Sequence, residues 1–148
     1  MVKSCYIHIP FCQSICSYCD FCKVFYKEDI ASSYLDCLEK EIKEKYKGEV
    51  LDTLYFGGGT PSSLSPSLLE KLFSLCSIFH LSPTCEITME GNVESLTEEK
   101  IQIMKDFGVN RISLGLETTI PSLQKTLERP FSVSYTHLRA HETRRQVV

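Results

Sequence analysis

The sequence predicts an α/β fold of about four β–α units arranged as a parallel sheet with covering helices. Strand-like and helix-like segments alternate along the 148 residues, and they recur at intervals of roughly 30 residues. Alternation of this kind is typical of parallel sheets, because each return to the sheet needs a crossover. A complete (β/α)8 barrel needs about 250 residues. We therefore expect either a small doubly wound sheet or about half of a barrel.

The first unit is expected to be a strand over Val2–Ile9 and a helix from about Asp29 to Tyr46. The strand mixes β-branched and aromatic residues and stops before Pro10. Gly48 is expected to end the helix. Apolar residues at every fourth position predict the buried stripe of this helix, which comprises Ile30, Tyr34, Leu38, Ile42 and Tyr46.

The second unit is expected to begin with the strand Val50–Phe56, which runs into three glycines. A helix should follow, with Ser65 as the N-cap and Pro66 at the first helical position. The helix face predicted to be buried carries Leu68, Leu69, Leu72, Phe73 and Cys76.

The third unit is expected to be the strand Cys85–Met89 and a helix that Thr97 or Ser95 caps and Gly108 ends. The fourth unit should comprise a strand over 111–116 and a helix over 120–127. Arg111, at the start of its strand, is expected at the rim opposite the strand ends, in a structural role.

Composition and charge indicate a soluble globular protein of the cytosol. Hydrophobic residues make up 43% and charged residues 24%, which is ordinary for such proteins. No apolar run approaches the roughly 18 residues that cross a bilayer, and the N-terminus is not expected to be a signal peptide. The net charge of −3 favours neither nucleic acid nor a membrane surface as partner.

Cysteine usage points to metal chemistry, because four of the eight cysteines fall in one short loop. Crowding of this kind in a reducing compartment indicates ligation rather than disulfides. Outside the loop, each cysteine stands alone on an apolar segment. We expect these four to be buried small hydrophobes: Cys5, Cys37, Cys76 and Cys85.

The loop has the spacing Cys12-x3-Cys16-x2-Cys19. Three thiolates can hold three irons of a [4Fe–4S] cluster and leave the fourth iron open, whereas electron-transfer clusters usually have four cysteine ligands. An open iron suits a cluster that chelates a substrate. Cys22 is expected to be a spare thiol. A four-thiolate zinc site that includes Cys22, or a disulfide knot, is the alternative.

Residues 6–21 (YIHIPFCQSICSYCDF) closely resemble the branch of radical SAM proteins that contains oxygen-independent coproporphyrinogen III oxidases and HemW-type haem chaperones. The branch opens with Tyr-x-His-x-Pro-[Phe/Trp]-Cys-x3-Cys-x-[Tyr/Phe]-Cys. The likeness continues in order through 56–62 (FGGGTPS), 86–92 (EITMEGN) and 108–117 (GVNRISLGLE). It implies that residues 1–131 form the N-terminal half of a partial TIM-type barrel.

The resemblance also implies the cofactors and the residues that bind them. Cys12, Cys16 and Cys19 would hold a [4Fe–4S] cluster, S-adenosylmethionine would bind the open iron and yield a 5′-deoxyadenosyl radical, and His8 would be catalytic. Most relatives have Gln where this chain has a glutamate at 117, which adds a charge and removes a donor. The residues implied to bind the cofactor are Tyr6, Phe21, Gly57, Gly58, Gly59, Thr60, Glu90 and Glu117.

Within this branch, two features favour the haem chaperone. The oxidase type carries a fourth cysteine two residues after the third, where this chain has Phe21, and it has a long extension before its Tyr-x-His motif. The alternatives are oxidative decarboxylation of coproporphyrinogen III, or an incomplete half barrel that binds nothing stably. The implied partners are haem or a porphyrinogen and an electron donor such as flavodoxin.

Residues 132–148 depart from the pattern of the rest of the chain. The string SYTHLRAHETR resembles a translated sequencing adapter. We expect this tail to lie outside the family domain, and its histidines to have no functional role.

Overall fold

The computed structural model describes residues 3–118 and 120–127. The described strands include a four-stranded parallel sheet in the order β1-β4-β5-β6. The strands lie side by side in chain order, as they do in a barrel. A doubly wound sheet instead reverses its order at a switch point, so the barrel-like alternative is confirmed. The bounds are β1 (Ser4–Ile9), β4 (Val50–Gly58), β5 (His80–Gly91) and β6 (Arg111–Leu114).

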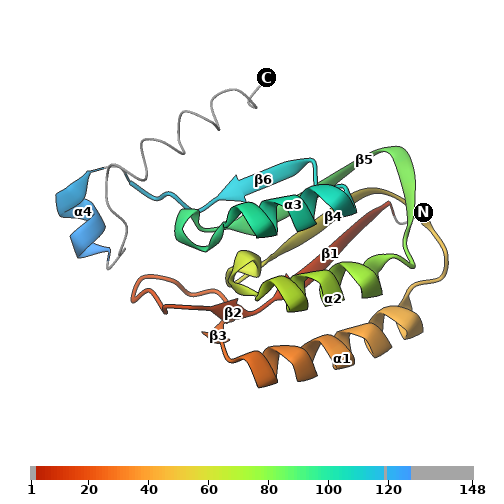
Figure 1. Cartoon of the computed structure of the whole chain (residues 1–148), viewed down its shortest axis with the longest axis horizontal. Coiled ribbons are helices and arrows are strands. Elements are labelled where there is room, and N and C mark those ends of the chain that lie inside the picture. Colours follow the sequence, from red (N-terminus) through yellow and green to blue (C-terminus); the bar gives the residue numbers. More distant parts are fainter. Residues whose placement is uncertain (1–2, 119, 128–148) are drawn as a thin grey trace.

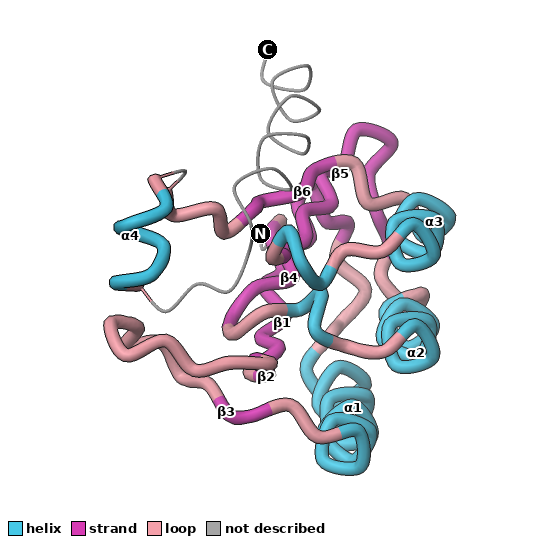
Figure 2. Tube along the Cα trace, turned by 60° about the vertical axis from the view of Figure 1, so that its left-hand side comes forward, coloured by secondary structure: helices cyan, strands magenta, loops and turns pink. Residues whose placement is uncertain are grey.

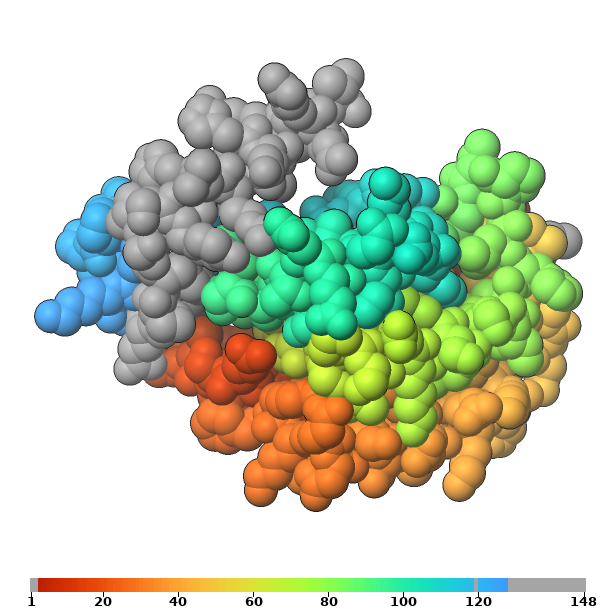
Figure 3. All heavy atoms as spheres, in the orientation of Figure 1, coloured from red at the N-terminus to blue at the C-terminus, as the bar shows by residue number. Residues whose placement is uncertain are grey.

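Three helices cover one face of this sheet (Figures 1 and 2). They are α1 (Glu28–Lys45), α2 (Pro66–Cys76) and α3 (Glu98–Phe107). In Figure 3 they form adjacent orange, yellow-green and blue-green bands. A fourth helix, α4 (Pro121–Thr126), lies at the end of the sheet to which the strands point. None of the helices within the described residues is long and apolar enough to cross a membrane.

The core lies between the sheet and these helices. Leu54 and Phe56 on β4 are fully buried. The Phe56 ring packs edge-on against Phe73 of α2 at 5.6 Å, and Phe73 stacks on Phe107 of α3 at 4.3 Å. Alternate residues of the strands point to the opposite, polar face. The core therefore fixes which side chains of β1 and β4 face away from the helices.

The predicted helix caps are confirmed. Ser65 accepts a hydrogen bond from the Leu68 amide at α2, and Thr97 accepts one from the Lys100 amide at α3, so Thr97 rather than Ser95 is the cap. Gly108 ends α3 in the left-handed region. All five residues of the predicted apolar face of α2 are buried.

Three predictions for α1 were wrong. Ile30 and Cys37 are exposed, and the helix ends at Lys45, before Gly48. Residues spaced strictly by four drift around the helix by roughly 40° per step, so such a stripe leaves the packed face. The stripe that packs alternates steps of four and three: Ala31, Leu35, Leu38 and Ile42. Of the isolated cysteines, Cys76 and Cys85 are buried as predicted, and Cys5 is half-buried.

Replacement of Leu54 by Ala should lower the free energy of unfolding by roughly 2–5 kcal/mol, because it leaves a cavity in the closed core. Leu123→Ala is the matched control, since that leucine is 46% exposed on α4. Urea unfolding followed by circular dichroism measures both. Equal losses for the two variants would contradict the assignment of the core.

Candidate functional site

A short backbone ladder closes the base of the cysteine loop. The chain leaves β1, forms β2 (Phe11–Cys12), and returns through β3 (Val24–Phe25). The Val24 amide donates to the Pro10 carbonyl at 2.8 Å, and the Tyr26 amide donates to the Cys12 carbonyl at 2.9 Å. The loop therefore projects from the carboxyl end of β1, on the side of the sheet away from α1–α3 (Figure 2).

The glycine-rich turn after β4 packs directly against the start of this loop. The Gly59 amide donates to the Ile9 carbonyl at 2.9 Å, and the Thr60 amide donates to the Phe11 carbonyl at 2.8 Å. A Cβ atom on Gly59 would lie 2.9 Å from the Cys12 sulfur. The turn can come this close only because position 59 has no side chain.

One cavity of about 390 Å³ lies between the loop and the ends of the strands. Lys23, Asn92 and Ser113 also line it, and the sequence had not predicted them as site residues. In the described part of the chain, no three His, Cys, Asp or Glu side chains are arranged around a position for a single metal ion. The predicted site residues that line the cavity are Cys12, Cys16, Cys19, Phe21, Gly58, Gly59, Thr60, Glu90 and Glu117.

The surroundings of Cys12 disfavour a thiolate that has no compensating positive charge. Burial raises the pKa of its thiol, a hydrogen bond with Thr60 lowers it, and the charges of Cys19 and Cys16 raise it further. The Lys23 ammonium lowers the pKa. Three neighbouring thiolates are therefore costly without a compensating cation, and a bound metal centre supplies that charge. The donor set fits an iron–sulfur cluster.

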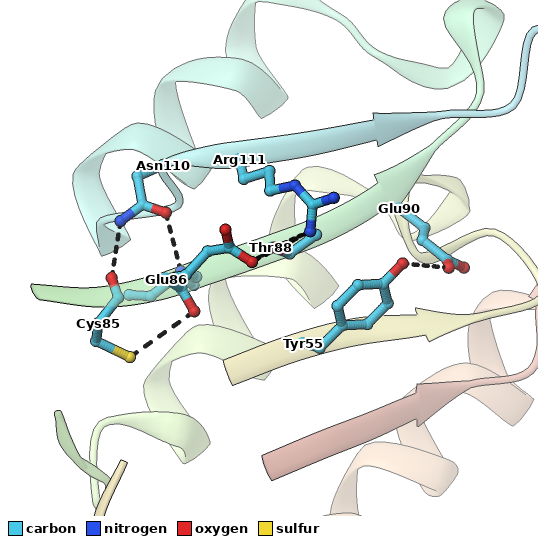
Figure 4. A network of polar contacts seen from close by, with 8 residues as sticks. Tyr55, Cys85, Glu86, Thr88, Glu90, Asn110 and Arg111 are labelled. Atoms are coloured by element: carbon cyan, nitrogen blue, oxygen red, sulfur yellow. Dashed lines mark hydrogen bonds and ion pairs between the residues drawn. The ribbon is translucent and has the colours of Figure 1, made fainter. Parts of the chain in front are cut away.

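Glu90, near the end of β5, is held by two donors. The Tyr55 hydroxyl donates to one carboxylate oxygen at 2.6 Å (Figure 4). The Gly58 amide donates to the other at 3.1 Å. Burial and the hydrogen bond to Glu90 raise the pKa of Tyr55, so that hydroxyl stays protonated and keeps donating. The fixed carboxylate can accept hydrogen bonds from an amine or hydroxyl in the cavity.

Tyr6, His8 and Gly57 do not line the cavity. His8 joins the Tyr6 hydroxyl at 3.1 Å and the Cys22 carbonyl at 3.1 Å, so its ring contacts the cysteine loop from outside. Cys22 is exposed and also lies outside the cavity lining. The catalytic role of His8 and the cofactor contact of Tyr6 stay predictions.

The two remaining predicted positions, Glu117 and Arg111, lie after and at the start of β6 (Arg111–Leu114). Glu117 borders the cavity with a φ of 58°, a left-handed conformation that is uncommon for residues other than glycine and is found at functional sites. Arg111 pairs with Glu86 at 3.1 Å (Figure 4) and lies opposite Thr88, two residues before Ser113 of the cavity lining, so its predicted place at the opposite rim was wrong. Its structural role stays a prediction.

The sequence did not predict a buried polar cluster that adjoins the cavity at Asn92. The Lys100 ammonium donates to the carbonyls of Ser62 at 2.8 Å and Ser95 at 3.2 Å, and burial lowers its pKa. The two serine hydroxyls bond to each other, and the Asn92 amide donates to Ser62. This cluster joins η1 (Pro61–Ser63) to η2 (Val93–Ser95), the turns that follow β4 and β5. A lone lysine in a helix sequence gives no signal of such burial.

Sequence reasoning also missed Tyr55 and Lys23. Tyr55 alternates with Leu54 and Phe56, so its orientation away from the core could be predicted. Its contact with Glu90 depends on the pairing of Tyr55 with Thr88 across β4 and β5, which the sequence does not specify. Lys23 donates to the Cys19 carbonyl within the loop.

Comparisons of this chain with family models and with known proteins point to the same family. A model of the radical SAM superfamily matches residues 6–142. The heme chaperone HemW of Bacillus subtilis (strain 168) is 41% identical over 133 residues, which cover 86% of this chain and 35% of that protein. The heme chaperone HemW of Lactococcus lactis subsp. lactis (strain IL1403) is 42% identical over 128 residues, 86% of this chain and 34% of that protein.

Among solved structures, coproporphyrinogen III oxidase (HemN) from Escherichia coli, a radical SAM enzyme, superposes with a TM-score of 0.82 and 27% identity. The match covers 90% of this chain and 32% of the oxidase chain. The described units therefore correspond to part of a radical SAM barrel. The chain spans about a third of the length of each of these relatives.

Gly59→Ala should weaken retention of iron, because the added Cβ would lie 2.9 Å from the Cys12 sulfur and from the Phe11 carbonyl oxygen. We expect at least a severalfold loss of bound iron after anaerobic reconstitution and gel filtration, measured by elemental analysis. Gly48→Ala is the control: nothing lies within 4 Å of its added Cβ, and its backbone φ of +90° makes alanine strained there, so it tests whether strain away from the site releases iron. Equal iron contents in Gly59→Ala and the unmodified protein would contradict the packing described above.

Proposed function

The chain belongs to the radical SAM superfamily, and from this premise we propose that Cys12, Cys16 and Cys19 hold its [4Fe–4S] cluster, in a protein that handles haem as HemW does. Membership implies a cluster of this kind and S-adenosylmethionine. The observation that carries the assignment is that the three thiols, the glycine-rich turn and Glu90 line one cavity at the carboxyl ends of parallel strands.

The residues around the cavity suggest a division of tasks. The three thiolates would ligate three irons, and the turn at Gly58–Thr60 would offer backbone groups to S-adenosylmethionine. Glu90, fixed by Tyr55 and Gly58, would accept hydrogen bonds from that ligand. When bound, the cluster and S-adenosylmethionine supply reductive radical chemistry; the protein orients them.

Two observations support the haem chaperone reading. The two HemW proteins are 41% and 42% identical to this chain, and Phe21 stands where the oxidase type carries a further cysteine. Structural likeness to coproporphyrinogen III oxidase supports radical decarboxylation as the second candidate.

The proposal also includes transfer of haem to an acceptor, reduction of the cluster by a donor such as flavodoxin, and a cytoplasmic location.

Anaerobic reconstitution should give about four irons per chain, as three-cysteine radical SAM clusters require. We also expect an EPR signal that changes on addition of S-adenosylmethionine. Cys12→Ala, Cys16→Ala and Cys19→Ala should each lose the stable cluster, whereas Cys37→Ala, an exposed cysteine on α1, should keep it.

A stable four-iron cluster in any of the three loop variants would overturn the ligand assignment. Zinc in place of iron in protein purified anaerobically would favour the four-thiolate zinc alternative. In that case Cys22→Ala should lose the metal, whereas under the cluster assignment it should leave the iron content unchanged.

The two candidate activities differ in their product. With cluster, reductant and S-adenosylmethionine present, we expect no decarboxylation of coproporphyrinogen III, as judged by mass spectrometry of the porphyrin pool. Formation of protoporphyrinogen IX by this chain would reverse the order of the two candidates. The Cys12→Ala variant controls for reaction that does not depend on the cluster.

A further inference from the structure

Thr60 contacts the sulfur of one of the three loop cysteines. Its Oγ1 atom lies 3.6 Å from the Cys12 sulfur, within hydrogen-bond distance for a sulfur acceptor. Both side chains are buried, at 6% and 7% exposure. A hydrogen bond between them is therefore shielded from water and correspondingly stronger.

The direction of this hydrogen bond follows from the charge of a ligating Cys12 together with a second contact of Thr60. The Asn92 side-chain amide donates to the same Thr60 oxygen at 3.4 Å. A threonine hydroxyl has one hydrogen to donate and two lone pairs to accept with. A Cys12 thiolate, the form that ligates a metal, has no hydrogen to donate, so Thr60 must be the donor to it. Asn92 takes one lone pair of the Thr60 oxygen and leaves the hydroxyl hydrogen available for this bond.

The backbone keeps this geometry in place. The Thr60 amide donates to the Phe11 carbonyl at 2.8 Å, directly before Cys12 in the chain. The Asn92 amide donates to Ser62 at 3.2 Å, so the turns that carry Thr60 and Asn92 are joined as well. The three side chains thus form a chain Asn92–Thr60–Cys12 that the fold itself positions.

We propose that Thr60, oriented by Asn92, donates a hydrogen bond to the Cys12 thiolate and raises the reduction potential of the cluster. This inference rests on the proposed function above and concerns a residue that positions and tunes, not one that reacts. Reduction adds one negative charge to the cluster, and a donor to a ligand sulfur stabilises the reduced form more than the oxidised form. Thr60 would therefore ease transfer of the electron into the cluster.

The test is an EPR-monitored redox titration of the reconstituted chain before S-adenosylmethionine is added. Thr60→Val removes the hydroxyl but keeps the branched shape, and it should lower the midpoint potential. We expect about a tenfold change in the reduction equilibrium, which is about 59 mV for one electron. Thr60→Ser keeps the hydroxyl and should retain the original potential. Thr88→Val, a buried threonine elsewhere on the sheet, is the matched control and should not shift it.

Equal potentials for Thr60→Val and the unmodified chain, or equal losses for Thr60→Val and Thr60→Ser, would overturn the proposal. If Thr60→Val takes up no cluster, Asn92→Asp decides, because its carboxylate takes the Thr60 hydrogen away from Cys12. Asn92→Asp should lower the midpoint potential more than Ser113→Asp does, although both variants add the same charge to the cavity lining. Equal shifts of the potential in these two variants would overturn the proposal. If the unmodified chain binds no four-iron cluster, the proposed function itself fails.

Discussion

Close packing of the glycine-rich turn against the start of the cysteine loop is the constraint on which the site depends. Two backbone hydrogen bonds, from Gly59 to Ile9 and from Thr60 to Phe11, join the end of β4 to the chain that leaves β1. They leave no room for a side chain at position 59. The first cysteine, the turn and the carboxyl ends of the strands are thereby held around one cavity.

Other contacts around the cavity extend this constraint to β5, the third strand of the sheet. Glu90 bridges Tyr55 and Gly58 from β5 to β4, and the buried Lys100 ammonium ties the two following turns through their carbonyls. A buried cation with fixed acceptors is costly to disturb, because removal of the ammonium would leave carbonyls without partners. The cavity is thus bordered by elements that cannot shift independently.

Much of the fold could be predicted, and the errors share a cause. Ser65, Pro66, Thr97 and Gly108 act through local hydrogen bonds or local backbone geometry, so their roles could be inferred from neighbouring residues alone. For α1, the direction from which the sheet packs decided which stripe is buried, and Cys37 and Ile30 fell outside it. The contact of Tyr55 with Glu90 and the burial of Lys100 also depend on residues distant in the chain, so the sequence did not predict them.

The sequence by itself determined the β–α alternation, the spacing of the three loop cysteines and the need for glycine at the turn, because each is a property of consecutive residues. Only the tertiary structure decided the strand order, which makes the sheet barrel-like, and the separation of Cys22 and His8 from the cavity. It also decided the contact of Thr60 with Cys12. These are relations between residues up to about 50 positions apart, which strand pairing alone brings together.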